Sequence, residues 1–158
     1  MEPASDTRDD AWMAEALHEA ALALEHDDVP VGAVVVDLAT GTVVARAHNA
    51  RERDHDPTAH AELLALRDAA HRAGTWRLSG HALVVTIEPC PMCAGAAWAA
   101  RIGRLVFGAA DPKAGSAGSL YNFAADPRLN HEIPLTSGVR AHACSELLTT
   151  FFRSRRPS

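Results

Sequence analysis

The amino-acid sequence predicts an α/β protein of one domain, residues 1–158, in which helices pack on a β-sheet. Three observations carry this prediction. A chain of 158 residues suits one domain with a sizeable core. Hydrophobic residues make up 47% and charged residues 22%, as in ordinary globular proteins. Helical and strand patterns alternate in the order αββαβαβ(αβ)α, with no internal repeat or low-complexity linker between them.

The first half of the chain predicts a helix, a hairpin of two strands and a second helix. Asp9 or Asp10 can cap the first helix, whose apolar side chains recur at helical spacing. A β-branched run and a returning strand form the hairpin. A polar loop then ends in Asp56-Pro57-Thr58, which closes on the second helix, and Gly74 ends that helix. These elements span about 9–26, 31–36, 42–48 and about 59–73.

The second half predicts strands that alternate with helices. Pro91 suits the first position of the third helix, because its missing N–H has no partner there. A loop rich in Gly and Ala occupies 111–118. The expected strands are 81–87, 105–108 and one near 139–141. The expected helices run from 92 to about 101, with Pro91 at the first position, and from 145 to 153.

The strongest functional motif is a His-x-Glu pair followed by a Pro-Cys-x-x-Cys segment. His60, Cys90 and Cys93 offer three zinc ligands and leave the fourth tetrahedral position for water, as in catalytic sites. Glu62 lies close enough to His60 to move protons to and from that water. This pattern is typical of zinc-dependent base deaminases.

Two other interpretations explain less of the motif. A redox C-x-x-C pair would leave His60 and Glu62 without a role. A structural zinc site needs a fourth Cys or His at similarly short spacing, and the third cysteine, Cys144, is isolated near the C-terminus. The ligand count therefore favours one catalytic zinc per chain.

The predicted elements explain how the motif assembles. His60 and Glu62 fall in the first turn of one helix, while Cys90 and Cys93 share a face at the start of the next. The positive ends of both helices favour the thiolate forms of the cysteines. Zinc with two thiolates acidifies its water less than zinc with three histidines, so a nearby carboxylate base is useful. We expect hydrolytic deamination in which zinc-bound water is the nucleophile and Glu62 shuttles protons.

Charge and composition bear on partners and location. The formal net charge of −5 argues mildly against a nucleic-acid partner, although the distribution of charge matters more. Acidic residues crowd the first thirty positions, and basic residues gather at Arg153, Arg155 and Arg156. No signal peptide or membrane-spanning run is evident, and three cysteines, two of them needed as thiolates, indicate a reducing compartment. We therefore expect a cytoplasmic protein.

Nearly the whole chain resembles bacterial tRNA-specific adenosine deaminases of the TadA type, within the cytidine deaminase-like superfamily. The zinc motif is common to the superfamily, whereas Asp111-Pro112-Lys113 and Phe151-Phe152-Arg153 point to the tRNA branch. The resemblance implies a three-layer α/β/α sandwich with a central mixed five-stranded sheet. The matching stretches are 29–33, 56–62, 86–96, 101–104 and 107–113.

The resemblance also implies a substrate and its contacts. The reaction would convert adenosine to inosine at the wobble position of a tRNA anticodon stem-loop, in a homodimer with one zinc per subunit. Asn49 matches a position that hydrogen-bonds the flipped base and sugar, and Asp111 one near the 2′-hydroxyl. Lys113, the only lysine, matches a phosphate contact. The other implied substrate contacts are Val31, Ala61, Pro89, Phe151, Phe152 and Arg153, with the two phenylalanines stacking on flanking bases.

The small residues of 94–100 allow close helix approach, so the third helix is expected in the dimer interface, with Trp98 as an anchor.

A free nucleobase deaminase, for guanine or cytosine, stays open as an alternative, since Pro91 also occurs between the cysteines of such enzymes. A non-catalytic RNA-binding subunit with structural zinc is the second alternative, and Glu62 argues against it.

Overall fold

A five-stranded mixed sheet forms the centre of the protein, which a computed structural model describes over residues 7–155. The strands are β1 Gly32–Asp37, β2 Val43–His48, β3 His81–Ile87, β4 Arg104–Ala109 and β5 Leu135–Thr136. Their spatial order is β2-β1-β3-β4-β5. Strand β1 runs antiparallel to β2 and β3, whereas β3, β4 and β5 run parallel. The hairpin and the mixed sheet are therefore confirmed.

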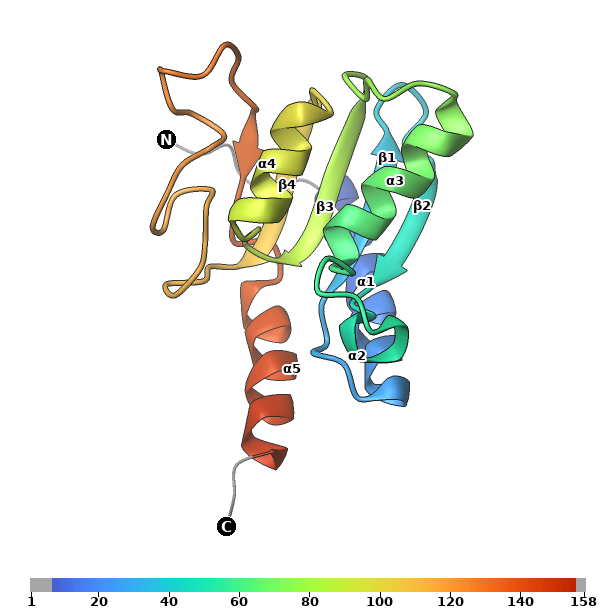
Figure 1. The fold of residues 1–158 in the computed structure, drawn as a ribbon, viewed down its shortest axis with the longest axis vertical. Coiled ribbons are helices and arrows are strands. Elements are labelled where there is room, and N and C mark those ends of the chain that lie inside the picture. Colours follow the sequence, from blue (N-terminus) through green and yellow to red (C-terminus); the bar gives the residue numbers. More distant parts are fainter. Residues whose placement is uncertain (1–6, 156–158) are drawn as a thin grey trace.

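Helices cover both faces of this sheet, which gives the expected three layers (Figure 1). The helices α3 and α4 lie on one face, and α1 lies on the other, where the first part of α5 joins it. Within 7–155, no helix combines the length and hydropathy needed to span a bilayer. The helical elements are α1 Thr7–Leu22, the 3-10 helix η1 Ala23–His26, α2 Arg51–Asp54, α3 Ala61–Ala73, α4 Pro91–Ala99 and α5 Ala141–Ser154.

The central strands are buried on both faces, so their side chains divide between two cores. In β1, Ala33 and Val35 belong to the core under α3 and α4, while Val34 and Val36 belong to the core under α1. Strand β3 alternates in the same way, and so does β4 from Leu105 to Phe107. This double burial explains why these strands appear in the sequence as continuous apolar runs rather than as polar–apolar alternation.

Helix α1 approaches β1 more closely than a side chain would allow. A Cβ atom at Gly32 would lie 2.0 Å from the carbonyl oxygen of Ala16 and 2.4 Å from the backbone nitrogen of Ala20. Glycine is therefore required there by the packing of the helix on the strand.

The prediction of a fifth strand near 139–141 is wrong. The fifth strand is β5, four residues earlier, and α5 already begins at Ala141. Gly138 and Arg140 have φ angles of +78° and +50°, which break an extended strand. The apolar pattern around the buried Val139 marks a turn that packs into the core, and α5 starts before the expected Ser145.

The start of the first helix and the loop before α3 also differ from the prediction. Helix α1 begins at Thr7, so Asp9 and Asp10 lie inside its first turn rather than at its start. Asp9 is fully buried and binds Arg104 through two contacts of 2.6 Å. The loop over 49–58 contains the short helix α2, Asp56 accepts hydrogen bonds from Thr58, and the N-cap residue of α3 is His60.

Candidate active site

The three expected metal ligands meet in the folded chain. The Nδ1 atom of His60 lies 3.6 Å from the Sγ atom of Cys90 and 3.5 Å from that of Cys93. The donor atoms of all three residues lie within 4.8 Å of one another, and among the described residues they form the one such His/Cys/Asp/Glu group.

These separations fit zinc. Zn–N and Zn–S bonds of about 2.05 and 2.3 Å at a tetrahedral angle put nitrogen and sulfur about 3.6 Å apart. The contacts of His60 with Cys90 and Cys93 have that length. The donor set, one imidazole and two thiols, is also one that zinc prefers over harder cations.

Two helix starts position the ligands. His60 is the N-cap residue of α3, and Cys90 is the N-cap residue of α4, with Pro91 at the next position. Neither N-cap side chain bonds its own helix, so both can face the metal position. Cys93 lies one turn into α4 and is fully buried. The two positive helix ends converge as predicted and favour anionic sulfur.

The two thiols differ in acidity. The pKa of Cys90 is lowered to about 4, chiefly by a hydrogen bond from Cys93, which outweighs burial, and also by a contact with His60. The pKa of Cys93 is raised by that same bond and by burial. The pKa of His60 is raised, mainly by its contact with Cys90. A thiolate beside the imidazole therefore supplies negative charge where a cation would bind.

Glu62 lies beside the ligands in the first turn of α3 and is 2% exposed. Burial raises its pKa to about 7. A carboxyl group with a pKa near neutrality can both accept and donate a proton.

Two of the three ligands, His60 and Cys90, line a cavity of about 170 Å³. Val31, Asn49 and Asp111, all expected as substrate contacts, line it together with Glu62. Ala114 also lines it and was missed, since nothing in a Gly/Ala-rich loop marks one alanine.

Backbone groups next to the ligands hold the walls of this cavity. Asn49 is 6% exposed, and its Oδ1 accepts the N–H of Ala61 at 2.8 Å. The carbonyl of Pro89 accepts the N–H of Ser116 at 2.8 Å. Ala61 and Pro89 are thus placed as anchors for neighbouring segments and do not line the cavity itself. With its oxygen held, Asn49 has its amide nitrogen available as a donor.

The expected RNA contacts divide between two further cavities. Lys113, Phe152 and Arg153 line one of about 380 Å³, between the 110–113 segment and α5. Phe151 lines another of about 360 Å³, which also includes Asn49. Phe151 is buried whereas Phe152 is 52% exposed, so the two rings have different surroundings. Arg156 lies outside the described residues.

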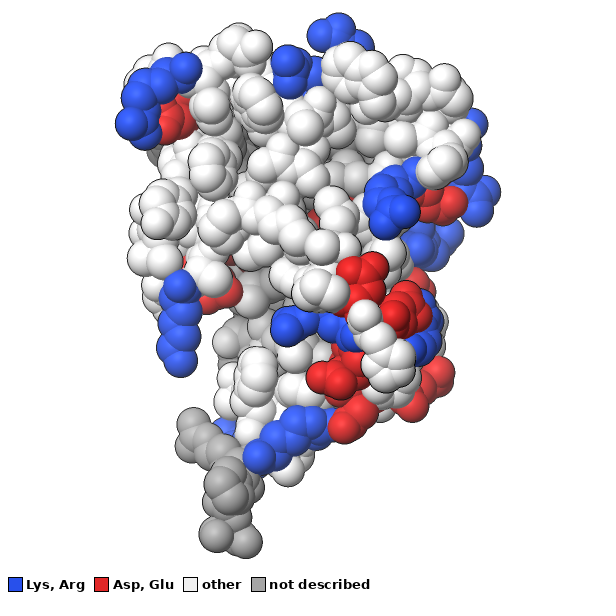
Figure 2. Space-filling model, in the orientation of Figure 1, with Lys and Arg blue, Asp and Glu red and all other residues white. Residues whose placement is uncertain are grey.

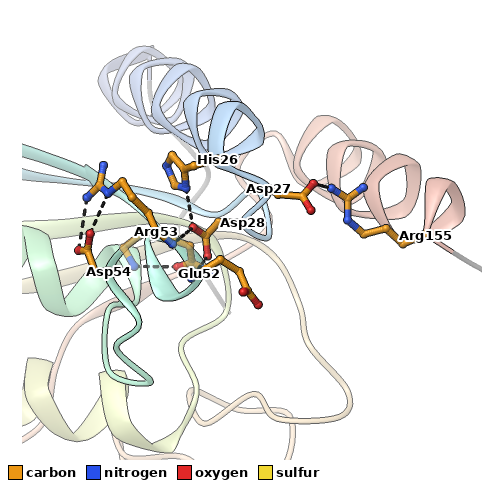
Figure 3. A network of polar contacts seen from close by, with 9 residues as sticks. His26, Asp27, Asp28, Glu52, Arg53, Asp54 and Arg155 are labelled. Carbon is orange, nitrogen blue, oxygen red and sulfur yellow. Dashed lines mark hydrogen bonds and ion pairs between the residues drawn. The ribbon is translucent and has the colours of Figure 1, made fainter.

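A polar network that the sequence did not reveal supports the Asn49 side of the site (Figure 3). The carboxylate of Asp28 accepts the backbone N–H groups of Glu52 at 2.8 Å and Arg53 at 3.3 Å, and it also contacts His26. It therefore fixes the start of α2, just after Asn49. Figure 3 also shows Arg155 reaching from the end of α5 to Asp27, an ion pair that joins α5 to this network.

A second unpredicted group is Glu88, which is 2% exposed at the end of β3. Burial opposes its ionisation, but hydrogen bonds from Ser119, Asp111 and Ala117 outweigh burial and lower its pKa. No spacing rule links position 88 to donors more than twenty residues away, so its role emerges only in the folded chain.

A His-Cys-Cys donor set with a non-ligand carboxyl group beside it is the arrangement of zinc-dependent base deaminases. The chain belongs to this family, since residues 6–109 match the family described as the cytidine and deoxycytidylate deaminase zinc-binding region. Zinc is the cofactor that this family and the donor set share.

Within the family the chain is similar to tRNA-specific adenosine deaminases. It is 47% identical over 150 residues to the one from Bacillus subtilis, covering 95% of this chain and 92% of the relative. It is 47% identical over 148 residues to the one from Haemophilus influenzae, covering 94% and 85%.

Solved structures agree on the fold. One from a study of A-to-I editing by tRNA:A34 deaminases at the wobble position superposes with a TM-score of 0.83 at 43% identity, covering 87% of this chain and 99% of that chain. A guanine deaminase from Nitrosomonas europaea superposes with a TM-score of 0.76 at 25% identity, covering 96% and 86%.

Proposed function

We propose that this chain is a zinc-dependent hydrolase that converts adenosine to inosine at the wobble position of a tRNA anticodon. One observation carries the proposal: His60 and Cys90 of the zinc-type donor set line the same cavity as the buried Glu62, and Asn49 and Asp111 line it too. The likeness to tRNA-specific adenosine deaminases over nearly the whole chain supports the choice of substrate. We treat residues 1–158 as one domain, because the described helices share one sheet.

His60, Cys90 and Cys93 would hold the zinc. When bound, zinc would supply a Lewis acid that lowers the pKa of a water molecule. Glu62 would accept one proton of that water as its oxygen adds to C6 of the purine, and would pass this proton to the ring nitrogen N1. Glu62 would then carry the second proton from that oxygen to the exocyclic amine, so that the bond from C6 to the amine nitrogen breaks and ammonia leaves. Its burial excludes bulk water from these transfers. Asn49 would donate through its amide nitrogen to the flipped nucleotide, and Val31 would contact the base.

The remaining contacts would position the RNA. Lys113 and Arg153 line one cavity and would meet phosphates there, while the exposed ring of Phe152 would stack on a flanking base. Figure 2 supports phosphate binding near α5, because acidic side chains, which repel phosphate, gather around α2 and the neighbouring end of α1. A phosphate backbone is therefore expected to leave the site toward α5. The buried Phe151 would hold the C-terminal end of α5 in place. Asp111 would lie near the ribose of the target nucleotide.

The deciding experiment compares an anticodon stem-loop that carries adenosine at the wobble position with free guanine and free cytosine. Purified zinc-loaded protein should release ammonia and form inosine only with the stem-loop. A stem-loop with guanosine at that position is the matched control and should give no product. Deamination of guanine or cytosine without any action on the stem-loop would overturn the proposal in favour of a free-base deaminase.

We further propose a homodimer formed through the surface between α3 and α4. A groove of about 420 Å³ there is lined mainly by apolar side chains, including Leu63, Leu66 and Ala99. Trp76 lies on its rim and is 61% exposed. Trp98, the anchor expected from the sequence, stacks instead on His131 of its own chain at 5.4 Å. Trp76 is more exposed than Trp98 and lines this groove, so we propose it as the main anchor.

A reducing compartment suits the site, and we propose the cytoplasm. All three cysteines are free, and two of them are the proposed zinc ligands. Oxidation of Cys90 or Cys93 would remove a thiolate ligand.

A further inference from the structure

We propose that Glu88 is a positioning residue that sets the loop 110–119 in place for the RNA substrate. The proposal rests on the function proposed above. Glu88 lies two residues before Cys90 but is not one of the three metal donors. Its carboxylate acts through the loop that it holds.

The carboxylate binds the loop near both ends. One oxygen, Oε1, accepts the backbone N–H of Asp111 at 3.0 Å. The other, Oε2, accepts the N–H groups of Ala117 at 3.0 Å and Ser119 at 2.9 Å. The hydroxyl of Ser119 also donates to Oε1. Four donors thus converge on one buried anion, and such charge-assisted bonds are stronger than neutral ones.

The middle of the loop closes directly over this carboxylate. A Cβ atom at Gly115 would lie 2.3 Å from the carboxyl carbon of Glu88, so a larger residue there would have to displace this carboxylate. Asp111, once placed, holds the next turn, because its Oδ1 accepts the N–H groups of Lys113 at 3.0 Å and Ala114 at 3.2 Å. The carboxylate of Glu88 thus holds Asp111, and the carboxylate of Asp111 holds the turn that follows it.

This loop forms a wall of two substrate cavities. Asp111 and Ala114 line the cavity at the metal ligands, while Ala110 and Lys113 line the cavity that includes Arg153. Glu88 borders the first cavity, but both of its oxygens are engaged by the loop. Its contribution to the reaction is therefore to align a nucleotide contact and a phosphate contact at once.

The test replaces the carboxylate by an amide of the same shape. Glu88→Gln introduces an N–H₂ group where N–H donors converge, so the loop loses part of its anchor. The matched control is Asp9→Asn, which makes the same change at another buried carboxylate whose partner Arg104 lies in β4. The readouts are zinc content, kcat and KM for the stem-loop, and hydrogen exchange of the amides at 111, 117 and 119.

With Glu88→Gln we expect zinc to be retained, KM to rise roughly tenfold with a smaller fall in kcat, and exchange of those amides to accelerate about tenfold or more. Asp9→Asn should leave KM and loop exchange at the wild-type level. Ser119→Ala removes one donor and should shift both readouts in the same direction, which keeps the proposal testable if Glu88→Gln does not fold.

Three results would overturn the proposal. They are an unchanged KM and unchanged loop exchange in Glu88→Gln, an equal rise of KM in Asp9→Asn, and loss of zinc in Glu88→Gln. If the wild-type protein does not act on the stem-loop, the proposed function fails, and the exchange data still decide whether Glu88 holds the loop.

Discussion

At the scale of single residues, the donor atoms of His60, Cys90 and Cys93 lie together, and Glu62 is buried in the same helix turn as His60. The sequence motif predicted this cluster, because ligand types and spacings depend on local chain geometry. His60 and Cys90 are both N-cap residues, and that local arrangement needs few long-range contacts. Asp28 and Glu88 could not be found in this way, since their partners are backbone N–H groups far along the chain.

The first prediction concerns Glu62. Glu62→Ala should retain zinc and lose deamination by a factor of roughly 10²–10⁴, because the carboxyl group moves protons and is not a ligand. Metal analysis and single-turnover assays on the same preparation measure both quantities. Loss of zinc together with activity would instead identify Glu62 as a ligand or a structural group.

The second prediction concerns the thiol ligands. Cys93→Ala should lose zinc and much of the stability, because metal binding across α3 and α4 contributes folding free energy. The control is Cys144→Ala, since Cys144 is also buried but lies in the opposite core. Cys144→Ala should remain fully metallated. A Cys93→Ala protein with full zinc and an unchanged melting temperature would rule out the ligand set.

At the scale of elements, periodicity located the central strands and helices but not the irregular connections. The runs that became β1 and β3 are long, apolar and β-branched, so the prediction needed only local pattern. Strand β5 has two residues, and α2 has four. Elements this short depend on tertiary partners, such as the Asp28 carboxylate at the start of α2, and their sequences carry little periodicity.

The contact of α1 with β1 leads to a third prediction. Gly32→Ala should destabilise the protein by roughly 1–3 kcal/mol, because the new methyl group would overlap the backbone of α1. Gly80→Ala is the control, since nothing lies within 4 Å of a Cβ atom there. Chemical denaturation measures both variants. Equal stabilities would mean that α1 can move away without cost.

The fourth prediction concerns the start of α2. Asp28→Asn should cost roughly 1–3 kcal/mol of stability through weaker bonds to the amides of Glu52 and Arg53. Although burial opposes ionisation, hydrogen bonds from those amides and His26 lower the pKa of Asp28 below its ordinary value of 3.8. The wild-type advantage is then fully present above that value and is lost as the pH falls through the lower folded pKa. Chemical denaturation of both proteins at pH 7 and below pH 3 tests this. A difference in the free energy of unfolding that is larger in acid than at pH 7 would contradict the prediction.

At the scale of the whole molecule, the apolar groove between α3 and α4 should hold a second copy of the chain. Trp76→Glu should weaken dimerisation by roughly 30-fold or more, as expected when an exposed aromatic anchor of an interface is replaced by a charge. Tyr121→Glu is the control, because Tyr121 is 59% exposed but lies outside the groove. Light scattering over a concentration series compares them. A wild-type chain that is monomeric at micromolar concentration would contradict the dimer.

The chain has a formal net charge of −5, so it must bind RNA through a local basic surface. Arg155 is paired with Asp27, so Lys113 and Arg153 are the cations expected to meet phosphates. Each phosphate contact with a single-stranded loop contributes about 0.7 to the slope of log affinity against log salt.

Lys113→Ala and Arg153→Ala should therefore each lower affinity for the anticodon stem-loop and reduce that slope by roughly 0.7. The control is Arg72→Ala near the far end of α3, where Arg72 pairs with Asp68. It should leave both affinity and slope unchanged, and all three variants should retain zinc. Binding titrations at several salt concentrations measure the slopes. The opposite outcome is that binding and turnover do not depend on salt concentration while free guanine or cytosine is deaminated rapidly. In that case the basic residues serve only to close a small pocket, and the free-base reaction becomes the better assignment.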